Sequence, residues 1–252
     1  MAVLDTGFDI THPDLNAKNT GTGRDFVNDD FGVMDDEGHG TAVSGIVGAV
    51  SNNGIGVAGL SWGVKIMPVK VCDAAGDCTL EDALNGIVWA TSGGANILNT
   101  SFGIPVSGPG ALMMQDIVNY THNAGVVMVN SAGNGDEYLD AIDMVYRVPA
   151  ELNHVIVVGA TDRFDARCAP TTSACNWAAP QASAWGPQLD LMAPGSLDLW
   201  TTDIMGSGGY NQTGDYNDGF GGTSAAAPHV AGTIALMLSV NPASALIRWK
   251  SS

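Results

Sequence analysis

Short apolar runs alternate with longer helix-like segments along most of this chain, and this alternation limits the folds open to it. The apolar runs are continuous in Val, Ile and Leu, as is typical of parallel strands covered on both faces. In residues 79–92, Leu80, Leu84 and Ile87 lie at helical spacing. The pattern predicts an α/β fold with a doubly wound, mostly parallel sheet flanked by helices. We expect strands at residues 2–4, 64–71, 95–100, 126–129, 155–159 and 189–193, and helices at residues 41–50, 79–92, 110–123 and 223–239.

The length of the chain fits one catalytic-sized domain. Its 252 residues can bury a large α/β core, and no internal repeat or linker interrupts them. We therefore interpret residues 1–252 as a single domain. Residues 195–222 are rich in Gly, Ser, Asp and Asn, and this composition predicts a long loop.

The charge balance excludes one class of partner. The chain carries 26 acidic and 9 Lys or Arg residues, a net charge of −17, so no basic stripe is present to neutralise phosphates. We expect no nucleic-acid partner. We expect no membrane partner either, because the most apolar stretch, residues 225–240, contains Pro228 and His229 and is more typical of a buried helix.

Three polar residues stand among glycines and small residues, far apart in the chain. Asp5 follows the apolar pair Val3-Leu4 and so ends a predicted strand, while His39 lies between two glycines and Ser224 opens a predicted helix. A serine hydroxyl becomes a nucleophile when an imidazole takes its proton and a carboxylate orients that imidazole. These residue types therefore predict a nucleophilic triad in the chain order Asp, His, Ser.

On residues 3–7, 38–41 and 222–229 the chain resembles the subtilisin-like serine peptidases, the subtilases, whose triad has this order. The resemblance implies a secreted, monomeric serine endopeptidase that acts on protein or peptide substrates and needs no cofactor for catalysis. Asp5, His39 and Ser224 are then the triad. The Asn of the family's Ala-Gly-Asn segment donates to the oxyanion, which makes Asn134 the side-chain donor and the Ser224 N–H the backbone donor.

The same resemblance implies where substrate binds. Ser101, Phe102 and Gly103 match the segment that lines the primary specificity pocket and pairs with substrate as an added strand. Gly76 and Leu80 match the opposite rim.

A structural calcium ion is a further implication of the resemblance. Asp14 matches a calcium ligand of the family, and the loop at residues 50–57 matches the rest of that site. Oxygen-rich, flexible loops suit calcium. The implied ligands are Asp14, Val50, Asn52, Ile55 and Val57.

The four cysteines form two local pairs in the sequence, Cys72 with Cys78 and Cys168 with Cys175. Three connectivities are open, and local pairing is the simplest. Disulfides indicate an oxidising compartment, whereas four free thiols in a cytosolic protein are the alternative. The spacing does not match a zinc site.

Other patterns in the sequence give competing hypotheses. Residues 54–59 spell G-x-G-x-x-G, but no helix follows, as a dinucleotide site requires. Asp5-Thr6-Gly7 lacks the second triplet of an aspartic protease. The acidic residues 29, 30 and 35–37 predict a solvated loop that could tune the His39 pKa or hold a cation. Because the sequence enters the catalytic strand directly, we expect a subtilase core trimmed at both ends. The alternative function is a shell that folds poorly or binds peptides without cleaving them.

Overall fold

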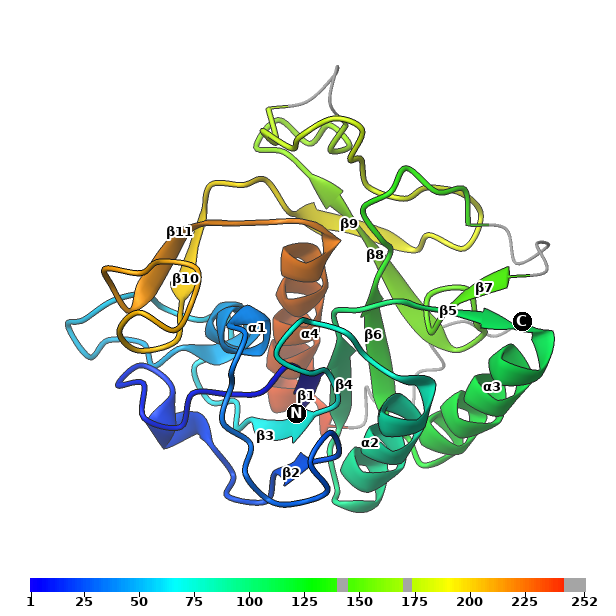
Figure 1. Cartoon of the computed structure of the whole chain (residues 1–252), viewed down its shortest axis with the longest axis horizontal. Helices are drawn as coiled ribbons and strands as arrows, with labels where there is room; N and C mark the ends of the chain where they lie inside the picture. The colour runs from blue at the N-terminus through cyan, green and yellow to red at the C-terminus, as the bar shows by residue number, and fades with distance from the viewer. Residues whose placement is uncertain (140–144, 170–173, 243–252) are drawn as a thin grey trace.

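A seven-stranded sheet forms the centre of the computed structural model, which describes residues 1–139, 145–169 and 174–242. The strand order is β2-β3-β1-β4-β6-β8-β9, and every pairing within it is parallel (Figure 1). The strands are β1 (Ala2–Asp5), β2 (Arg24–Asp25), β3 (Met67–Lys70), β4 (Ile97–Thr100), β6 (Val127–Ser131), β8 (Val155–Thr161) and β9 (Leu191–Pro194). The predicted α/β fold with a parallel sheet is confirmed.

Helices cover both faces of this sheet. Helices α2 (Leu80–Ser92) and α3 (Gly108–Asn123) pack side by side on one face, and α1 (His39–Gly48) and α4 (Thr223–Val240) pack together on the other (Figure 1). A short 3-10 helix, η1 (Asn16–Lys18), follows β1. The predicted helices are present, and α1 begins two residues earlier than expected, at His39 itself.

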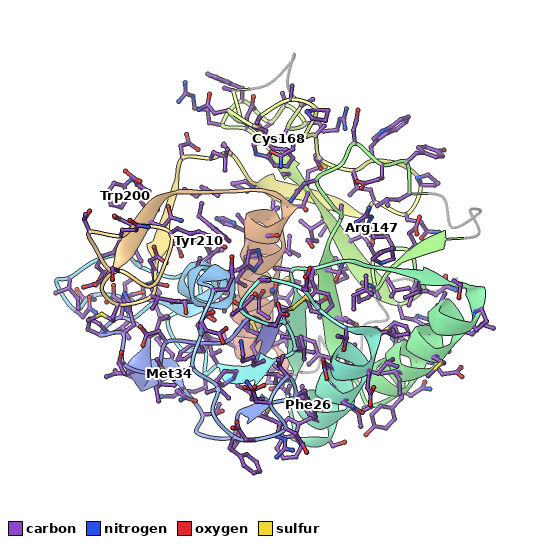
Figure 2. The ribbon with its side chains drawn as sticks, in the orientation of Figure 1. Phe26, Met34, Arg147, Cys168, Trp200 and Tyr210 are labelled. Atoms are coloured by element: carbon purple, nitrogen blue, oxygen red, sulfur yellow. A yellow bond between two sulfur atoms is a disulfide. The ribbon has the colours of Figure 1, made fainter. Side chains whose placement is uncertain are left out.

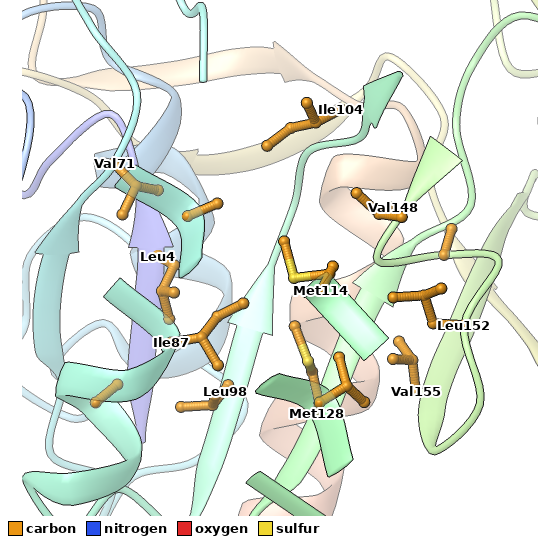
Figure 3. Close-up of a cluster of buried hydrophobic side chains, with 14 of the residues drawn as sticks. Leu4, Val71, Ile87, Leu98, Ile104, Met114, Met128, Val148, Leu152 and Val155 are labelled. Atoms are coloured by element: carbon orange, nitrogen blue, oxygen red, sulfur yellow. The ribbon is translucent and has the colours of Figure 1, made fainter. Parts of the chain in front are cut away.

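Alternating strand residues supply the two halves of the core. Leu98 and Met128 are almost fully buried under Met114 of α3 (Figure 3). The neighbouring residue Ile97 points to the other face, where it joins the cluster that contains Ile234 of α4. Because side chains alternate between the faces of a strand, a strand buried on both faces reads as a continuous apolar run.

Helix α4 runs under the middle of the sheet. By length and composition alone it is apolar enough to span a membrane, and it is the one such helix in the part of the chain that the structure describes. It packs against β4, β6, β8, β9 and α1, and Ala225, Ala226 and Ala227 in its first turn are fully buried. These small side chains let the helix approach the sheet closely. The contacts support the expectation that α4 is a core helix.

Two small antiparallel pairs were not expected from the sequence. β5 (Ile104–Ser107) pairs with β7 (Val145–Val148), and β10 (Leu199–Thr202) pairs with β11 (Tyr216–Phe220). The prediction of one long loop over residues 195–222 is therefore wrong. The hydroxyls of Thr201 and Thr202 donate to the carbonyls of Ala42 and Thr41, at 2.6 and 2.8 Å, and so fix β10 against α1. This tertiary contact overrides a local composition that favours a loop.

Candidate active site

Three adjacent strands, β1, β4 and β6, end at one edge of the sheet and carry most of the predicted site. Asp5 ends β1, Ser101 follows β4, and Asn134 lies three residues beyond β6. The register pairs Leu4 with Thr100, and Thr100 with Asn130, so these strand ends are level. β1 has β3 on one side and β4 on the other, which makes it the point where the strand order reverses. Open α/β sheets bind ligands at such a switch point.

Asp5 and His39 are in direct contact at this edge. The Nδ1 of His39 lies 2.7 Å from Oδ1 of Asp5, and the Thr6 backbone N–H donates to the same oxygen at 2.8 Å. The Asp5 side chain is 2 % exposed and that of His39 is 23 % exposed. An Nδ1–H that donates to the carboxylate leaves Nε2 of the neutral imidazole as an acceptor.

The electrostatic surroundings shift the His39 pKa. Burial alone would lower it, but the charge and hydrogen bond of Asp5, followed by the charges of Glu37 and Asp35, raise the pKa of His39 above its ordinary value. These charges stabilise the imidazolium form of His39 more than water stabilises it in a free imidazole.

Asp35 connects the end of β1 to the start of α1. This carboxylate is 5 % exposed and accepts from the Thr41 N–H and hydroxyl at 2.8 and 2.7 Å, and from the Gly38 N–H at 3.0 Å. It also accepts from the Thr6 hydroxyl at 2.8 Å. The prediction of a solvated acidic loop is wrong for Asp35, which is buried because it satisfies the free N–H groups of a helix start.

Ser224 lies in the first turn of α4 and contacts Ser101. Its Oγ donates to the Ser101 carbonyl at 3.1 Å, and the Ser101 hydroxyl donates back to the Ser224 carbonyl at 3.1 Å. Within the described residues no hydrogen bond joins Ser224 to His39. The two residues nevertheless begin neighbouring helices, and Ser101 and Asp5 lie on adjacent strand ends.

Asn134 is oriented by the residue that precedes Ser224. Its Oδ1 accepts from both the N–H and the hydroxyl of Thr223, each at 2.9 Å, and the Thr223 oxygen accepts from the Gly133 N–H at 3.0 Å. Because the amide group is planar, fixing its oxygen also fixes its nitrogen. This nitrogen lies beside Gly222: if that glycine carried a Cβ, the nitrogen would be its nearest neighbour, at 3.2 Å. Sequence reasoning missed this role of Thr223, although its place in Gly-Thr-Ser was visible.

A cleft of about 340 Å³ opens beside Asp5 and His39. It brings together four of the five predicted substrate residues, Gly76, Ser101, Phe102 and Gly103. Leu80 is not among the lining residues; it is partly buried and packs against the core. Asp77 and Glu37 also line the cleft.

Both local cysteine pairs are disulfides, Cys72–Cys78 and Cys168–Cys175, and no cysteine is free. The Cys72–Cys78 bridge closes the loop that forms one rim of the cleft. In the chain-entropy model a loop of this size is worth roughly 2–2.5 kcal/mol.

The surroundings of Asp14 do not fit a calcium ion as they are arranged. The fully buried carboxylate accepts from the Asn53 amide at 2.5 Å, the Val57 N–H at 3.1 Å and the Tyr216 hydroxyl at 3.0 Å. These groups are donors, whereas calcium needs six to eight oxygen ligands. No group of three or more His, Cys, Asp or Glu among the described residues could hold a metal.

Of the other predicted calcium ligands, Val57 contacts the Asp14 carboxylate through its N–H, and no hydrogen bond among the described residues joins that carboxylate to Val50, Asn52 or Ile55. The Val50 backbone N–H donates to the backbone carbonyl of Asp14 at 2.7 Å. Asn52 is exposed, with a φ of 61°, and the Ile55 N–H donates to the Asn53 side chain. Burial, followed by the hydrogen bond to Asp14 and its charge, raises the pKa of Tyr216 to about 12, so the phenol stays a donor.

Comparisons with known proteins show which proteases this chain is similar to. A sequence model described as the subtilase family matches residues 1–251. The chain is 36 % identical over 239 residues to a thermophilic serine proteinase of Bacillus sp. strain AK1, covering 95 % of this chain and 52 % of that protein. It is 34 % identical to thermitase of Thermoactinomyces vulgaris, covering 98 % of this chain and 77 % of that protein. An extracellular protease of Xanthomonas campestris is also 34 % identical, over 96 % of this chain and 44 % of that protein.

Solved structures show the same fold. Proteases from Pseudoalteromonas arctica match with a TM-score of 0.77 and 30 % identity, over 96 % of this chain and 77 % of theirs. A cold adapted subtilisin-like serine proteinase matches with a TM-score of 0.73 and 28 % identity, over 95 % of this chain and 75 % of that chain. The chain spans about half the length of several curated relatives that it matches.

Proposed function

The chain belongs to the subtilase family, and on that premise we propose that residues 1–252 form one catalytic domain that hydrolyses peptide bonds as a serine endopeptidase. One observation carries the proposal. The 2.7 Å contact between His39 and Asp5 lies at the switch point of the sheet, with Ser224 and Asn134 held at the next two strand ends. A fold-level likeness alone would not assign the activity.

The triad acts through one proton. His39 Nε2 takes the proton of Ser224 Oγ as that oxygen attacks the substrate carbonyl carbon, and Asp5 stabilises the imidazolium that forms. His39 then gives the proton to the leaving amine, and water later releases the acyl group by the same route. Before the first step the Ser224 hydroxyl must turn from the Ser101 carbonyl, 3.1 Å away, toward His39.

The tetrahedral intermediate carries a negative oxygen, and we assign two hydrogen-bond donors to it. One is the Asn134 amide, whose oxygen is held by Thr223, and the other is the Ser224 N–H. The N-terminal end of α4 adds its positive dipole at the same position. Donors fixed before the reaction need no reorganisation during it.

The cleft supports a proposal for how substrate binds, and the disulfides support one for the compartment in which the protein acts. A peptide in extended form pairs with residues 101–103 as an added strand, with Gly76 on the facing rim. The two disulfides fit an oxidising compartment, and one relative is an extracellular protease, which supports action outside the cell on protein or peptide substrates. We propose a monomer with no nucleic-acid or membrane partner.

A peptide-binding shell that does not cleave is the second candidate. The observation in its favour is that Ser224 donates to Ser101 and not to His39. Hydrolysis of a fluorogenic peptide separates the two, with Ser224→Ala as the matched variant. A protease should lose about 10⁶ in kcat, the scale known for subtilisin, while the variant still binds peptide. Peptide binding by the wild type without any turnover would establish the shell.

A further inference from the structure

Glu37 bonds the backbone of the residue that the mechanism uses as its base. One oxygen of the Glu37 carboxylate accepts the His39 N–H at 2.8 Å. Because His39 is the first residue of α1, this is one of the N–H groups that a helix start leaves without a partner in the helix. Glu37 therefore fixes where the His39 backbone begins its helical turn.

Tyr210 holds Glu37 from a part of the chain 173 residues away. Its hydroxyl lies 3.1 and 3.0 Å from the two carboxylate oxygens. Its ring packs on Gly38, where an added Cβ would lie 3.5 Å from the ring. In Figure 2 Tyr210 lies between the β10–β11 pair and helices α1 and α4.

The Tyr210 segment is itself anchored. The carboxylate of Asp203, fully buried after β10, accepts from the Tyr210 N–H at 3.2 Å and from the Asn211 N–H at 2.6 Å. Phe220 completes the enclosure, with its ring 5.5 Å from that of His39 and 6.3 Å from that of Tyr210. The residues around His39 are thus held by β10, β11 and the segment between them.

We propose that Glu37 and Tyr210 form a clamp that positions His39 for its role as the general base. The proposal rests on the proposed function, because it assigns two positioning residues to the same reaction. Glu37 supplies a hydrogen-bond acceptor and a negative charge. Tyr210 holds that carboxylate in place, and the hydrogen bond that it donates weakens the effect of the carboxylate charge on His39.

Several titratable groups surround His39 and the clamp. The groups that face His39 or its cleft are Asp5 from β1, Asp35 and Glu37 before α1, Asp77 on the opposite rim, and Tyr210 after β10. The buried Lys70 is paired with Asp36 at 2.6 Å. Burial, followed by the charge and hydrogen bond of Glu37, raises the pKa of Tyr210, so its hydroxyl remains a donor throughout the working range.

Substitutions at Glu37 and Tyr210 should shift the acid limb of the kcat/KM profile against pH in opposite directions. Glu37→Gln keeps an acceptor for the His39 N–H but removes the charge, so the apparent pKa should fall by about 0.5 unit. Tyr210→Phe removes a donor from the carboxylate, so its charge acts more strongly on His39 and the apparent pKa should rise by a smaller amount. A merely structural loosening would not move the limb in opposite directions.

A third variant separates position from charge. Glu37→Ala removes acceptor and charge together, so it should show the downward shift and also lose about tenfold in kcat at the plateau, with KM changed less. Glu37→Gln should lose less at the plateau than Glu37→Ala. Asp116→Asn on α3 is the control, because it removes one exposed charge far from the clamp and should leave the profile unchanged.

The experiment is a kcat/KM profile from pH 5 to 9 for each variant, with far-ultraviolet circular dichroism to confirm folding. The proposal is overturned if Glu37→Gln and Tyr210→Phe move the limb in the same direction, or if both superimpose on Asp116→Asn. A wild type that folds but hydrolyses no peptide would instead refute the proposed function.

Discussion

Replacing Thr223 with valine tests how Asn134, the proposed oxyanion donor, is held. Valine has nearly the same shape, so the change removes one hydroxyl and little volume. That hydroxyl donates to Asn134 Oδ1 at 2.9 Å and accepts from the Gly133 N–H at 3.0 Å. Thr223 is 1 % exposed, so its hydroxyl makes both bonds on a side chain that is shielded from solvent.

The size of the effect can be worked from these bonds. Leaving the Gly133 N–H without an acceptor should cost about 1–3 kcal/mol of folding stability. Asn134 keeps the second bond, from the Thr223 N–H at 2.9 Å, so its orientation is weakened and not lost. We expect kcat to fall about tenfold, against about 10²–10³ for Asn134→Ala, the range known for the equivalent subtilisin donor. KM should change little, because the donor acts on the transition state.

The assay is steady-state hydrolysis of a fluorogenic peptide, together with denaturant unfolding. Thr223→Ser keeps the hydroxyl and is the matched control, which should stay within a few-fold of the wild type. In the double variant with Asn134→Ala, the valine should add almost no further loss of kcat, because both changes act on one group. Full additivity in the double variant would refute the assigned role of Thr223.

The further predictions concern pH, Tyr216 and calcium. Burial lowers the pKa of His39, but the charges of Asp5, Glu37 and Asp35 more than offset this effect. The acid limb of kcat/KM should therefore show one protonation step above about pH 6.5. A rate maximum at about pH 3–4 would exclude His39 as the base. The stability that protonated His39 contributes should be full below about pH 6.5 and lost as pH rises through its raised pKa, as unfolding of wild type and His39→Ala at several pH values would measure. Tyr216→Phe should lower stability by about 1.5–3 kcal/mol, because the buried Asp14 carboxylate loses a donor, and Tm should be equal in EDTA and in millimolar calcium. A calcium-dependent rise in Tm that Asp14→Ala abolishes would restore the calcium interpretation.

The sequence predicts the sheet well and marks the candidate triad residues, both for physical reasons. Strands such as β6 and β8 are buried on both faces, so their apolar runs mark them without knowledge of their neighbours. Asp5, His39 and Ser224 stand out because each is polar in a glycine-rich or small-residue segment. Candidate functional residues that are marked by residue type and local spacing can therefore be predicted from the sequence.

What the sequence could not predict depends on contacts between distant segments. β11 has the sequence YNDGF, which lacks an apolar run, and it forms by pairing with β10. Lys70 has a charged side chain that is 1 % exposed, which is explained only by its bonds to Asp36, Thr6 and Cys72. Such partners follow from the fold and not from local pattern.

The central claim is that Asp5, His39 and Ser224 act as one unit, and covalent labelling tests it most directly. A fluorophosphonate reacts with a serine whose proton is taken by an assembled base. Mass spectrometry of the labelled wild type should place the adduct on Ser224, and folded His39→Ala should react at least about 10³ times more slowly. Equal labelling of the two proteins, an adduct on another residue, or no labelling of the folded wild type would contradict the account.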